Sequence, residues 1–214
     1  RRGSKEAVAK APLRETLASL FLRACDYDGA EPVLDPMCGS GTFVIEAAEI
    51  AAGRHAGRSR AFAFEQLAVF EAQSWADLKA QAAAAPRADL LFQGSDRDPG
   101  AVRMAQDNAA RAGVGDLCRF EPAAVTDLQR PHGPPGLVMV NPPYGDRIGN
   151  RGALVGVHRT LGQVLRERFT GWRVGLITSD AALARATGLP FAAPGPIVDH
   201  GGLKVRLHRT APLS

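Results

Sequence analysis

The feature that most constrains the fold of this chain is an alternation of short apolar runs with longer amphipathic segments. This alternation predicts parallel strands joined by right-handed crossovers, with helices on both faces of a twisted sheet. The expected strands are residues 32–34, 90–92 with an end near Asp96, 119–121, 137–140 and 174–178, and the expected helices are 12–25, 42–52, one beginning at 99, and 154–169. Two further strand candidates, near 197–198 and over 203–207, flank Gly201 and Gly202 and predict an antiparallel C-terminal hairpin.

Two of the expected helices carry start signals. Pro12 suits the first turn of the helix over 12–25. Asp98 can cap the helix that begins at 99, and Pro99 fits the first position of that helix. On the first helix, the apolar residues expected to share one face are Leu13, Leu17, Leu20, Phe21 and Ala24.

The composition fits one globular domain. The 214 residues are 45% hydrophobic and 22% charged, which suits a chain with a substantial core. We therefore expect residues 1–214 to form a single domain. No apolar run approaches membrane-spanning length, and no apolar stretch follows the basic N-terminus, so neither a membrane association nor a secretory signal is expected.

Cysteine usage and charge narrow the chemistry. The three cysteines lie far apart and the five histidines show no ligand spacing, which argues against a metal site or a disulfide framework and favours a reducing cytoplasm. The formal charge of +4 and the pI of about 9.3 permit a polyanionic partner without establishing one.

Three polar residues stand where expected strands end. These are Asp35, Asp96 and Asn141. In a parallel sheet the loops after successive strands lie along one edge, and ligands bind there, near the point where the strand order reverses. We therefore expect these three residues to share one ligand-binding edge.

A glycine-rich loop follows the first of these positions. Gly39 and Gly41 allow a tight turn and a close approach of a ligand. Val44 stands where a dinucleotide fingerprint would place a third small residue, and no lysine follows the glycines as in a phosphate-binding P-loop. A carboxylate at Asp35 would repel pyrophosphate but suits a ligand with ammonium and sulfonium charges, such as S-adenosylmethionine. A plain strand-turn-helix with a capping acid is the alternative.

Asp96 is the candidate for holding a ribose, because a carboxylate at that strand end can accept from both hydroxyl groups. Asp98 competes for this role, but Asp96 comes first after the strand. The long separation between Gly41 and Asp96 predicts an insertion with its own helix over about 54–87.

The most specific motif is the tetrapeptide Asn141-Pro142-Pro143-Tyr144. Two prolines remove two backbone donors, so the loop presents mainly acceptors. The Asn141 side-chain carbonyl and the Pro142 backbone carbonyl can both accept from one NH2 group, and Tyr144 offers a ring on which a flipped base can stack. This combination fits methylation of an exocyclic amine by positioning and electrostatics. A proline-rich turn with Tyr144 merely packing is the alternative.

Segments 35–43, 94–96 and 141–145 together resemble the class I amino-methyltransferases. Segments 10–18 and 60–75 extend the resemblance to the bacterial guanine-N2 methyltransferases of large-subunit (23S) ribosomal RNA, over nearly the whole chain. The resemblance implies a Rossmann-like class I methyltransferase fold, S-adenosyl-L-methionine as cofactor, and guanine N2 in ribosomal RNA as the methylated group.

The resemblance also implies roles for individual residues. Asn141, Pro142, Pro143 and Tyr144 would hold the target base as the catalytic set. The residues expected around the cofactor are Pro12, Asp35, Pro36, Cys38, Gly39, Ser40, Gly41, Thr42, Asp96, Arg97 and Ala124. Ala124 stands where the family often has an acid that meets the adenine amine, so adenine recognition is expected to use backbone groups or Asp127. His200-Gly201-Gly202 replaces the family's Asn-Gly, and His200 is expected as a turn residue.

The resemblance also bears on how the chain would bind RNA and on which other functions are possible. Family members usually carry an N-terminal RNA-binding THUMP domain, and we expect it to be absent from this chain. Arg60, Arg147 and Arg151 are candidates for contacts with RNA phosphates, although a solvated basic surface explains them equally well. Alternatives are methylation of DNA adenine N6, transfer RNA guanine N2 or a protein glutamine amide, and an inactive module that binds cofactor and RNA.

Overall fold

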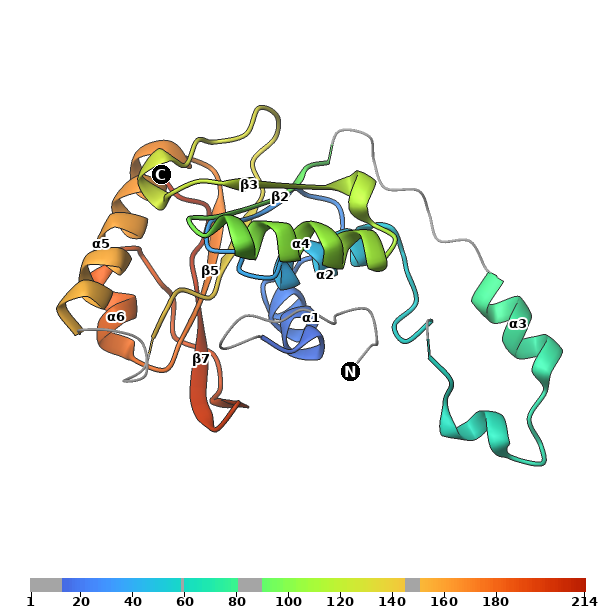
Figure 1. The fold of residues 1–214 in the computed structure, drawn as a ribbon. Helices are drawn as coiled ribbons and strands as arrows, with labels where there is room; N and C mark the ends of the chain where they lie inside the picture. Colours follow the sequence, from blue (N-terminus) through green and yellow to red (C-terminus); the bar gives the residue numbers. More distant parts are fainter. Residues whose placement is uncertain (1–12, 59, 81–89, 145–150) are drawn as a thin grey trace.

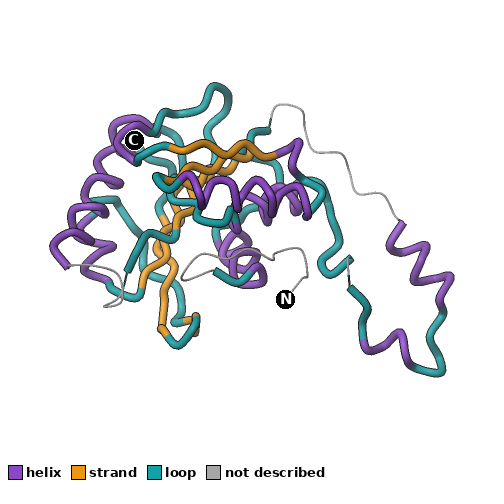
Figure 2. The backbone as a smooth tube through the Cα atoms, in the orientation of Figure 1, coloured by secondary structure: helices purple, strands orange, loops and turns teal. Residues whose placement is uncertain are grey.

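The fold is built on a seven-stranded sheet with the strand order β3-β2-β1-β4-β5-β7-β6. Figures 1 and 2 show helices packed around the strands. The computed structural model describes residues 13–58, 60–80, 90–144 and 151–214. The strands are β1 (Val33–Asp35), β2 (Phe92–Asp96), β3 (Cys118–Pro122), β4 (Leu137–Val140), β5 (Arg173–Thr178), β6 (Val198–His200) and β7 (Leu203–Arg209).

The pairing of the strands places a topological switch point beside β1. Strands β1 to β5 pair in parallel, whereas β7 runs antiparallel to both β5 and β6. The order runs outward from β1 through β2 to β3 on one side and through β4 to β5 on the other. This confirms the expected mostly parallel sheet with an antiparallel C-terminal hairpin, and the switch point is where such sheets bind ligands.

Helices cover both faces of the sheet. The helices of the described residues are α1 (Glu15–Ala24), α2 (Thr42–Ala51), α3 (Ala72–Ala80), α4 (Pro99–Arg111), α5 (Arg151–Arg168) and α6 (Ala181–Ala186), with short 3-10 helices η1 (Ala63–Gln66), η2 (Gly115–Leu117) and η3 (Val125–Asp127). One buried cluster joins α1, α2 and α4 to the sheet, and a second joins α5 and α6 to the opposite face.

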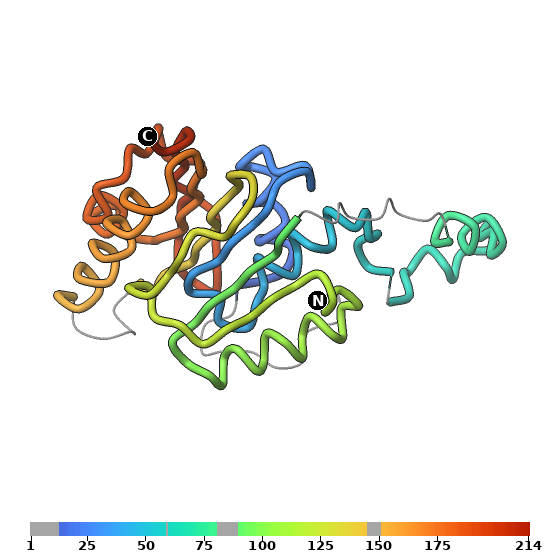
Figure 3. The backbone as a smooth tube through the Cα atoms, turned by 90° about the horizontal axis from the view of Figure 1, so that it is seen from above, coloured from blue at the N-terminus to red at the C-terminus, as the bar shows by residue number. Residues whose placement is uncertain are grey.

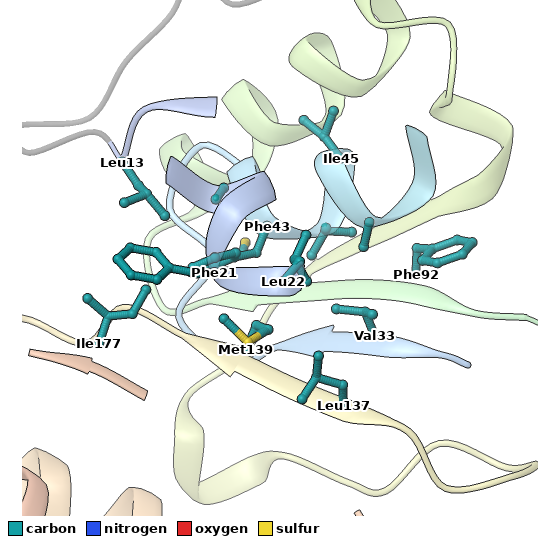
Figure 4. Close-up of a cluster of buried hydrophobic side chains, with 14 of the residues drawn as sticks. Leu13, Phe21, Leu22, Val33, Phe43, Ile45, Phe92, Leu137, Met139 and Ile177 are labelled. Carbon is teal, nitrogen blue, oxygen red and sulfur yellow. The ribbon is translucent and has the colours of Figure 1, made fainter. Parts of the chain in front are cut away.

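Strand β4 shows how the sheet divides these two clusters. Leu137 and Met139 belong to the cluster under α1, α2 and α4 (Figure 4). Val138 and Val140 belong to the cluster under α5 and α6. All four residues are buried because successive side chains of a strand point to opposite faces and both faces are covered.

Local sequence signals predicted the start of α4 correctly but not the start of α1. Asp98 accepts a hydrogen bond from the Gly100 amide and Pro99 occupies the first position of α4, as predicted. The start predicted for α1 was too early. Leu13 and Arg14 precede the helix, Arg14 is extended (φ −71°, ψ 140°), and Pro12 lies outside the described residues.

The segment of residues 60–80, between α2 and β2, extends away from the sheet and its covering helices (Figures 1 and 3). Its helix α3 and the 3-10 helix η1 contain no buried residue. At the other end of the chain, Gly201 and Gly202 form the turn between β6 and β7, while His200 is the last residue of β6 and is buried. The expectation of His200 as a turn residue is therefore wrong.

Within the described ranges, no helix combines the length and the apolar character needed to cross a membrane.

Candidate cofactor and base site

The three strand-end residues lie at one edge of the sheet around its switch point. Asp35 ends β1 and Asp96 ends β2, and Asn141 directly follows β4. The register pairs Asp35 with Gly94, so Asp96 lies two residues beyond the level of Asp35. Leu34 pairs with Val138, so Asn141 also lies two residues beyond that level. Asp96 and Asn141 therefore flank the carboxyl end of β1 from the two neighbouring strands, as the sequence predicted.

The glycine loop is tied by its backbone to the end of β2. The Cys38 amide donates to the Ser95 carbonyl over 2.9 Å, and the Gly39 amide donates to Asp96 Oδ2 over 3.0 Å. Gly39 and Gly41 have positive φ angles of 52° and 81°. The loop thus turns tightly above β1 and rests on the residue expected to hold a ribose.

The carboxylate of Asp96 is fixed in place by two backbone donors. In addition to the Gly39 bond, Asp96 Oδ1 accepts from the Asp98 amide over 3.0 Å. Each carboxylate oxygen has a further lone pair, so it can still accept a ligand hydroxyl. Asp98, the competing candidate, directs its own Oδ1 to the Gly100 amide as the cap of α4.

Three residues that the predicted site did not include shape the same loop. Asn108 of α4 is buried, and its Nδ2 donates to the Ser40 carbonyl over 2.9 Å. A Cβ added at Gly41 would meet the ring of Phe120 at 3.1 Å and the Cβ of Ala105 at 2.9 Å. The only sequence signal for the contact between Asn108 and Ser40 is an asparagine on the apolar side of an amphipathic helix.

Alanine substitutions at the two loop glycines are expected to have different effects, one mainly on stability and the other mainly on cofactor binding. We expect Gly41→Ala to destabilise the fold by roughly 1–3 kcal/mol, because a positive φ and a clash with Ala105 act together. Nothing among the described residues lies within 4 Å of a Cβ built on Gly39. Gly39→Ala should therefore cost only the strain of its φ angle, about 1 kcal/mol, while placing a methyl group in the space expected for the cofactor.

Thermal denaturation and titration with S-adenosylhomocysteine separate these effects. Gly41→Ala should lower Tm more than Gly39→Ala, and Gly39→Ala should weaken cofactor binding more than its Tm predicts. Equal losses of affinity and stability in both variants would contradict the assignment of open space at Gly39.

Asp35 is a buried carboxyl group at the base of this loop. Its Oδ1 accepts from the Met37 amide over 3.0 Å, which directs the group toward the loop. Burial raises the pKa of Asp35 to about 8; the Met37 hydrogen bond lowers it, and the nearby charge of Asp96 raises it. No cationic side chain among the described residues neutralises this buried carboxyl group, so it suits a ligand that brings positive charge.

The tetrapeptide has one buried side-chain oxygen that the described residues leave without a hydrogen-bond partner. Asn141 Oδ1 is buried and makes no hydrogen bond within the described part of the chain. An unpaired buried acceptor costs about 1–3 kcal/mol, so a ligand donor is its natural partner. Pro142 is buried and Pro143 is half-buried.

Tyr144 packs more deeply than the sequence suggested. It belongs to the core cluster that contains Leu13 and Leu154, and it is 7% exposed. Burial raises the pKa of its phenol to about 12, so it is neutral at physiological pH. Stacking of a base on Tyr144 stays a prediction, and it requires the ring to become accessible on one side.

The remaining residues predicted to contact the cofactor differ in how deeply they are buried. Pro36, Cys38, Ser40 and Thr42 are buried in the loop and the start of α2. Arg97 is exposed after β2, and Ala124 is half-buried. The Ala123 amide donates to the Asp96 carbonyl, and the Ala124 carbonyl accepts from the Asp127 amide, so the backbone after β3 lies beside the end of β2.

The predicted phosphate contacts have partners or lie outside the described residues. Arg147 lies outside them. Arg151 pairs with Asp180 at 3.1 Å although its side chain is 73% exposed. The guanidinium carbon of Arg60 lies 3.9 Å from the ring centre of Phe62. Among the described residues, no group of three or more His, Cys, Asp or Glu side chains is placed to hold a metal ion.

Comparison with known proteins identifies the family. The family model for the "RMKL-like, methyltransferase domain" matches residues 2–191. The chain belongs to this family of methyltransferase domains. It is 40% identical over 189 residues to the Ribosomal RNA large subunit methyltransferase K/L of Vibrio campbellii; the match covers 85% of this chain and 27% of that protein. The chain thus spans about a quarter of the length of such curated relatives.

Solved structures of related domains share the fold of this methyltransferase domain. A possible methylase from Clostridium difficile 630 superposes with a TM-score of 0.88 at 28% identity, covering 100% of this chain and 56% of that one. SMU.472, solved in complex with SAH, superposes with a TM-score of 0.86 at 26% identity and the same coverage. The domain therefore has the Rossmann-like class I methyltransferase fold that the sequence predicted.

Proposed function

We propose that this domain transfers a methyl group from S-adenosyl-L-methionine to an exocyclic amino group of a nucleobase, guanine N2 in large-subunit ribosomal RNA. The observation that carries the proposal is the meeting of Asp35, Asp96 and Asn141 at the switch point, with Asn141 Oδ1 buried and unpaired among the described residues. Membership of the RMKL-like family and similarity to ribosomal RNA methyltransferases support the choice of chemistry and substrate.

The residues at this edge fit the proposed cofactor. Open space at Gly39 allows close approach to the loop backbone, and Asp96 is held with lone pairs to spare for a ribose. Asp35 supplies a carboxylate that a cationic ligand would ionise. When bound, S-adenosylmethionine supplies an electrophilic methyl group on a sulfonium, so the protein needs neither a metal nor a covalent nucleophile.

The catalytic contribution of the chain is to hold the accepting amine. Asn141 Oδ1 accepts one N–H of the base amine, and the Pro142 carbonyl is proposed to accept the other. Holding both N–H bonds favours a pyramidal nitrogen and stabilises the positive charge that develops on it. Orientation of the amine toward the loop would supply the remaining acceleration, and the amine proton that the methyl group replaces would pass to solvent.

The test of the proposal is product identification. Protein and labelled cofactor are incubated separately with unmodified large-subunit ribosomal RNA, transfer RNA and DNA, and the modified nucleosides are separated. We expect N2-methylguanosine from the ribosomal RNA. N6-methyladenine from DNA, or label in transfer RNA alone, would overturn the proposed substrate, and label in none of them would overturn the proposed reaction.

Binding of RNA phosphates predicts a salt dependence. We expect the affinity for ribosomal RNA to fall steeply between about 50 and 200 mM salt, because each neutralised phosphate releases counterions. The measurement is the slope of log affinity against log salt concentration. A flat response would remove the phosphate contacts from the proposal.

A further inference from the structure

The extended segment between α2 and β2 carries an aromatic cluster outside the main core. Phe62 and Phe64 stack with ring centres 5.3 Å apart, and Trp75 of α3 meets both rings edge-on at 5.7 and 5.0 Å. Phe70 lies 6.0 Å from Phe64. These contacts hold η1 and α3 together although neither contains a buried residue.

A pocket of about 180 Å³ opens beside this cluster. Its lining residues are His55, Ala56, Arg58, Phe62, Trp75, Leu78 and Lys79. The lining combines two aromatic rings and a leucine with three basic side chains, and it contains no carboxylate. This composition is that of a site for a flat, apolar and electron-rich group attached to an anion.

The pocket is anchored to the body of the domain. Arg58 pairs with Glu49 of α2 at 2.6 Å and donates to the Ala112 carbonyl beyond α4. A Cβ on Gly57 would lie 2.6 Å from the ring of Phe62, so a glycine there lets that ring pack against the backbone. The inner end of the pocket therefore has a defined position relative to the sheet.

Two further observations indicate that the pocket binds a ligand. The Nε1 of Trp75 is buried and has no hydrogen-bond acceptor within the described ranges. Lys79 Nζ lies 5.3 Å from the centre of the Trp75 ring, and His55 is exposed. A ligand acceptor that reaches the indole N–H would satisfy it, and Lys79 and His55 line the same pocket as Trp75, where they can meet negative charge.

We propose that this pocket binds one unpaired nucleotide of the RNA substrate, with its base against Trp75 and Phe62 and its phosphate beside Lys79 and His55. The inference rests on the proposed function for the choice of RNA, and it adds a second contact far along the chain from the target-base loop. The pocket would then help to select RNA in which an unpaired nucleotide accompanies the methylated guanine.

The first test uses the fluorescence of Trp75. A short unstructured RNA oligonucleotide is titrated into the wild-type chain and into Trp75→Phe, and an abasic oligonucleotide serves as the control ligand. The chain's other tryptophan, Trp172, is fully buried in the core. We expect quenching by the RNA, loss of that quenching in Trp75→Phe, and little quenching by the abasic backbone. Absence of quenching in the wild type would overturn the inference.

The second test uses charge reversal with a matched control. His55→Glu/Lys79→Glu should lower RNA affinity about tenfold or more, because it replaces attraction to a phosphate by repulsion. Arg119→Glu/His132→Glu also replaces one cationic residue and one histidine, both exposed, on and after β3, and should change affinity much less. Affinity for S-adenosylhomocysteine and far-UV circular dichroism should be unaltered in both. Equal RNA affinities of the two double variants would also overturn the inference.

Failure of the pocket and failure of the proposed function give different results. If the wild type methylates ribosomal RNA and the pocket variant has an unchanged KM for it, the pocket assignment is wrong and the reaction stands. If RNA quenches Trp75 but no nucleic acid is methylated, the pocket stands and the proposed reaction is wrong.

Discussion

Asn141→Ala is expected to lower kcat for methyl transfer by roughly 10²–10³-fold, the range seen when one preorganised group that stabilises transition-state charge is removed. Asn141 Oδ1 is buried and unpaired, so its deletion removes a potential ligand contact without breaking a hydrogen bond among the described residues. Single-turnover kinetics on ribosomal RNA with saturating cofactor measure the effect.

The specificity of this loss is checked in two ways. Affinity for S-adenosylhomocysteine should be nearly unchanged in Asn141→Ala, because the glycine loop is held by Cys38 and Gly39 contacts to β2. Asn141→Asp keeps an acceptor oxygen and should retain more activity than the alanine variant. Turnover within a few-fold of wild type in Asn141→Ala would remove Asn141 from the catalytic set.

Asp35→Asn is expected to stabilise the free protein at alkaline pH and to weaken cofactor binding. Burial raises the pKa of Asp35 from its ordinary value of 3.8 to about 8. Because the pKa of Asp35 is higher in the folded state than in the unfolded state, its protonated form stabilises the fold. This stabilisation is complete at pH values below the unfolded-state pKa, and it is lost as the pH rises toward and through about 8. Ionised Asp35 therefore costs stability in the free protein at alkaline pH, and the cost is fully developed above about pH 8.

The stability effect follows from the shape of the two side chains. An amide resembles the protonated acid and can still accept from the Met37 amide. Denaturation of wild type and Asp35→Asn should give similar Tm values near pH 4 and a widening advantage for the variant from about pH 5 to 9. A constant difference across this range would show that Asp35 does not titrate as its burial requires.

The binding effect has the opposite sign. A cationic ligand favours the ionised carboxylate, so wild-type affinity for S-adenosylmethionine should increase as pH rises toward about 8, with proton release on binding. Asp35→Asn should bind about tenfold or more weakly and lose this pH dependence. Calorimetric titration in buffers of different ionisation enthalpy measures both quantities, and an unchanged affinity in the variant would exclude Asp35 from the cofactor site.

The sheet and its binding edge could be predicted because their signals are local. Residues 137–140 form β4 as predicted, and the short apolar runs ending at Asp35 and Asp96 sufficed to align those residues along one edge. Parallel crossovers then fix which ends of the strands lie together. The packing of individual side chains was less predictable: Leu20 was expected on the buried face of α1 and is 63% exposed.

Contacts that depend on distant segments could not be predicted from local patterns. The bond from Gly39 to Asp96 joins residues 57 positions apart, and the bond from Asn108 to Ser40 joins residues 68 apart. The burial of Tyr144 depends on packing within a core that also includes Leu13 and Leu154. Such contacts arise only after the sheet has brought these segments together, which is why motif analysis indicated the site but not how it is held.

The most direct test of the proposed cofactor site is a crystal structure of this chain with S-adenosylhomocysteine. The ligand should lie over the glycine loop at the carboxyl end of β1, with its ribose on Asp96 and its sulfur directed toward Asn141. Ligand density elsewhere, such as the opposite edge beside Arg173 and Arg209, would contradict the account.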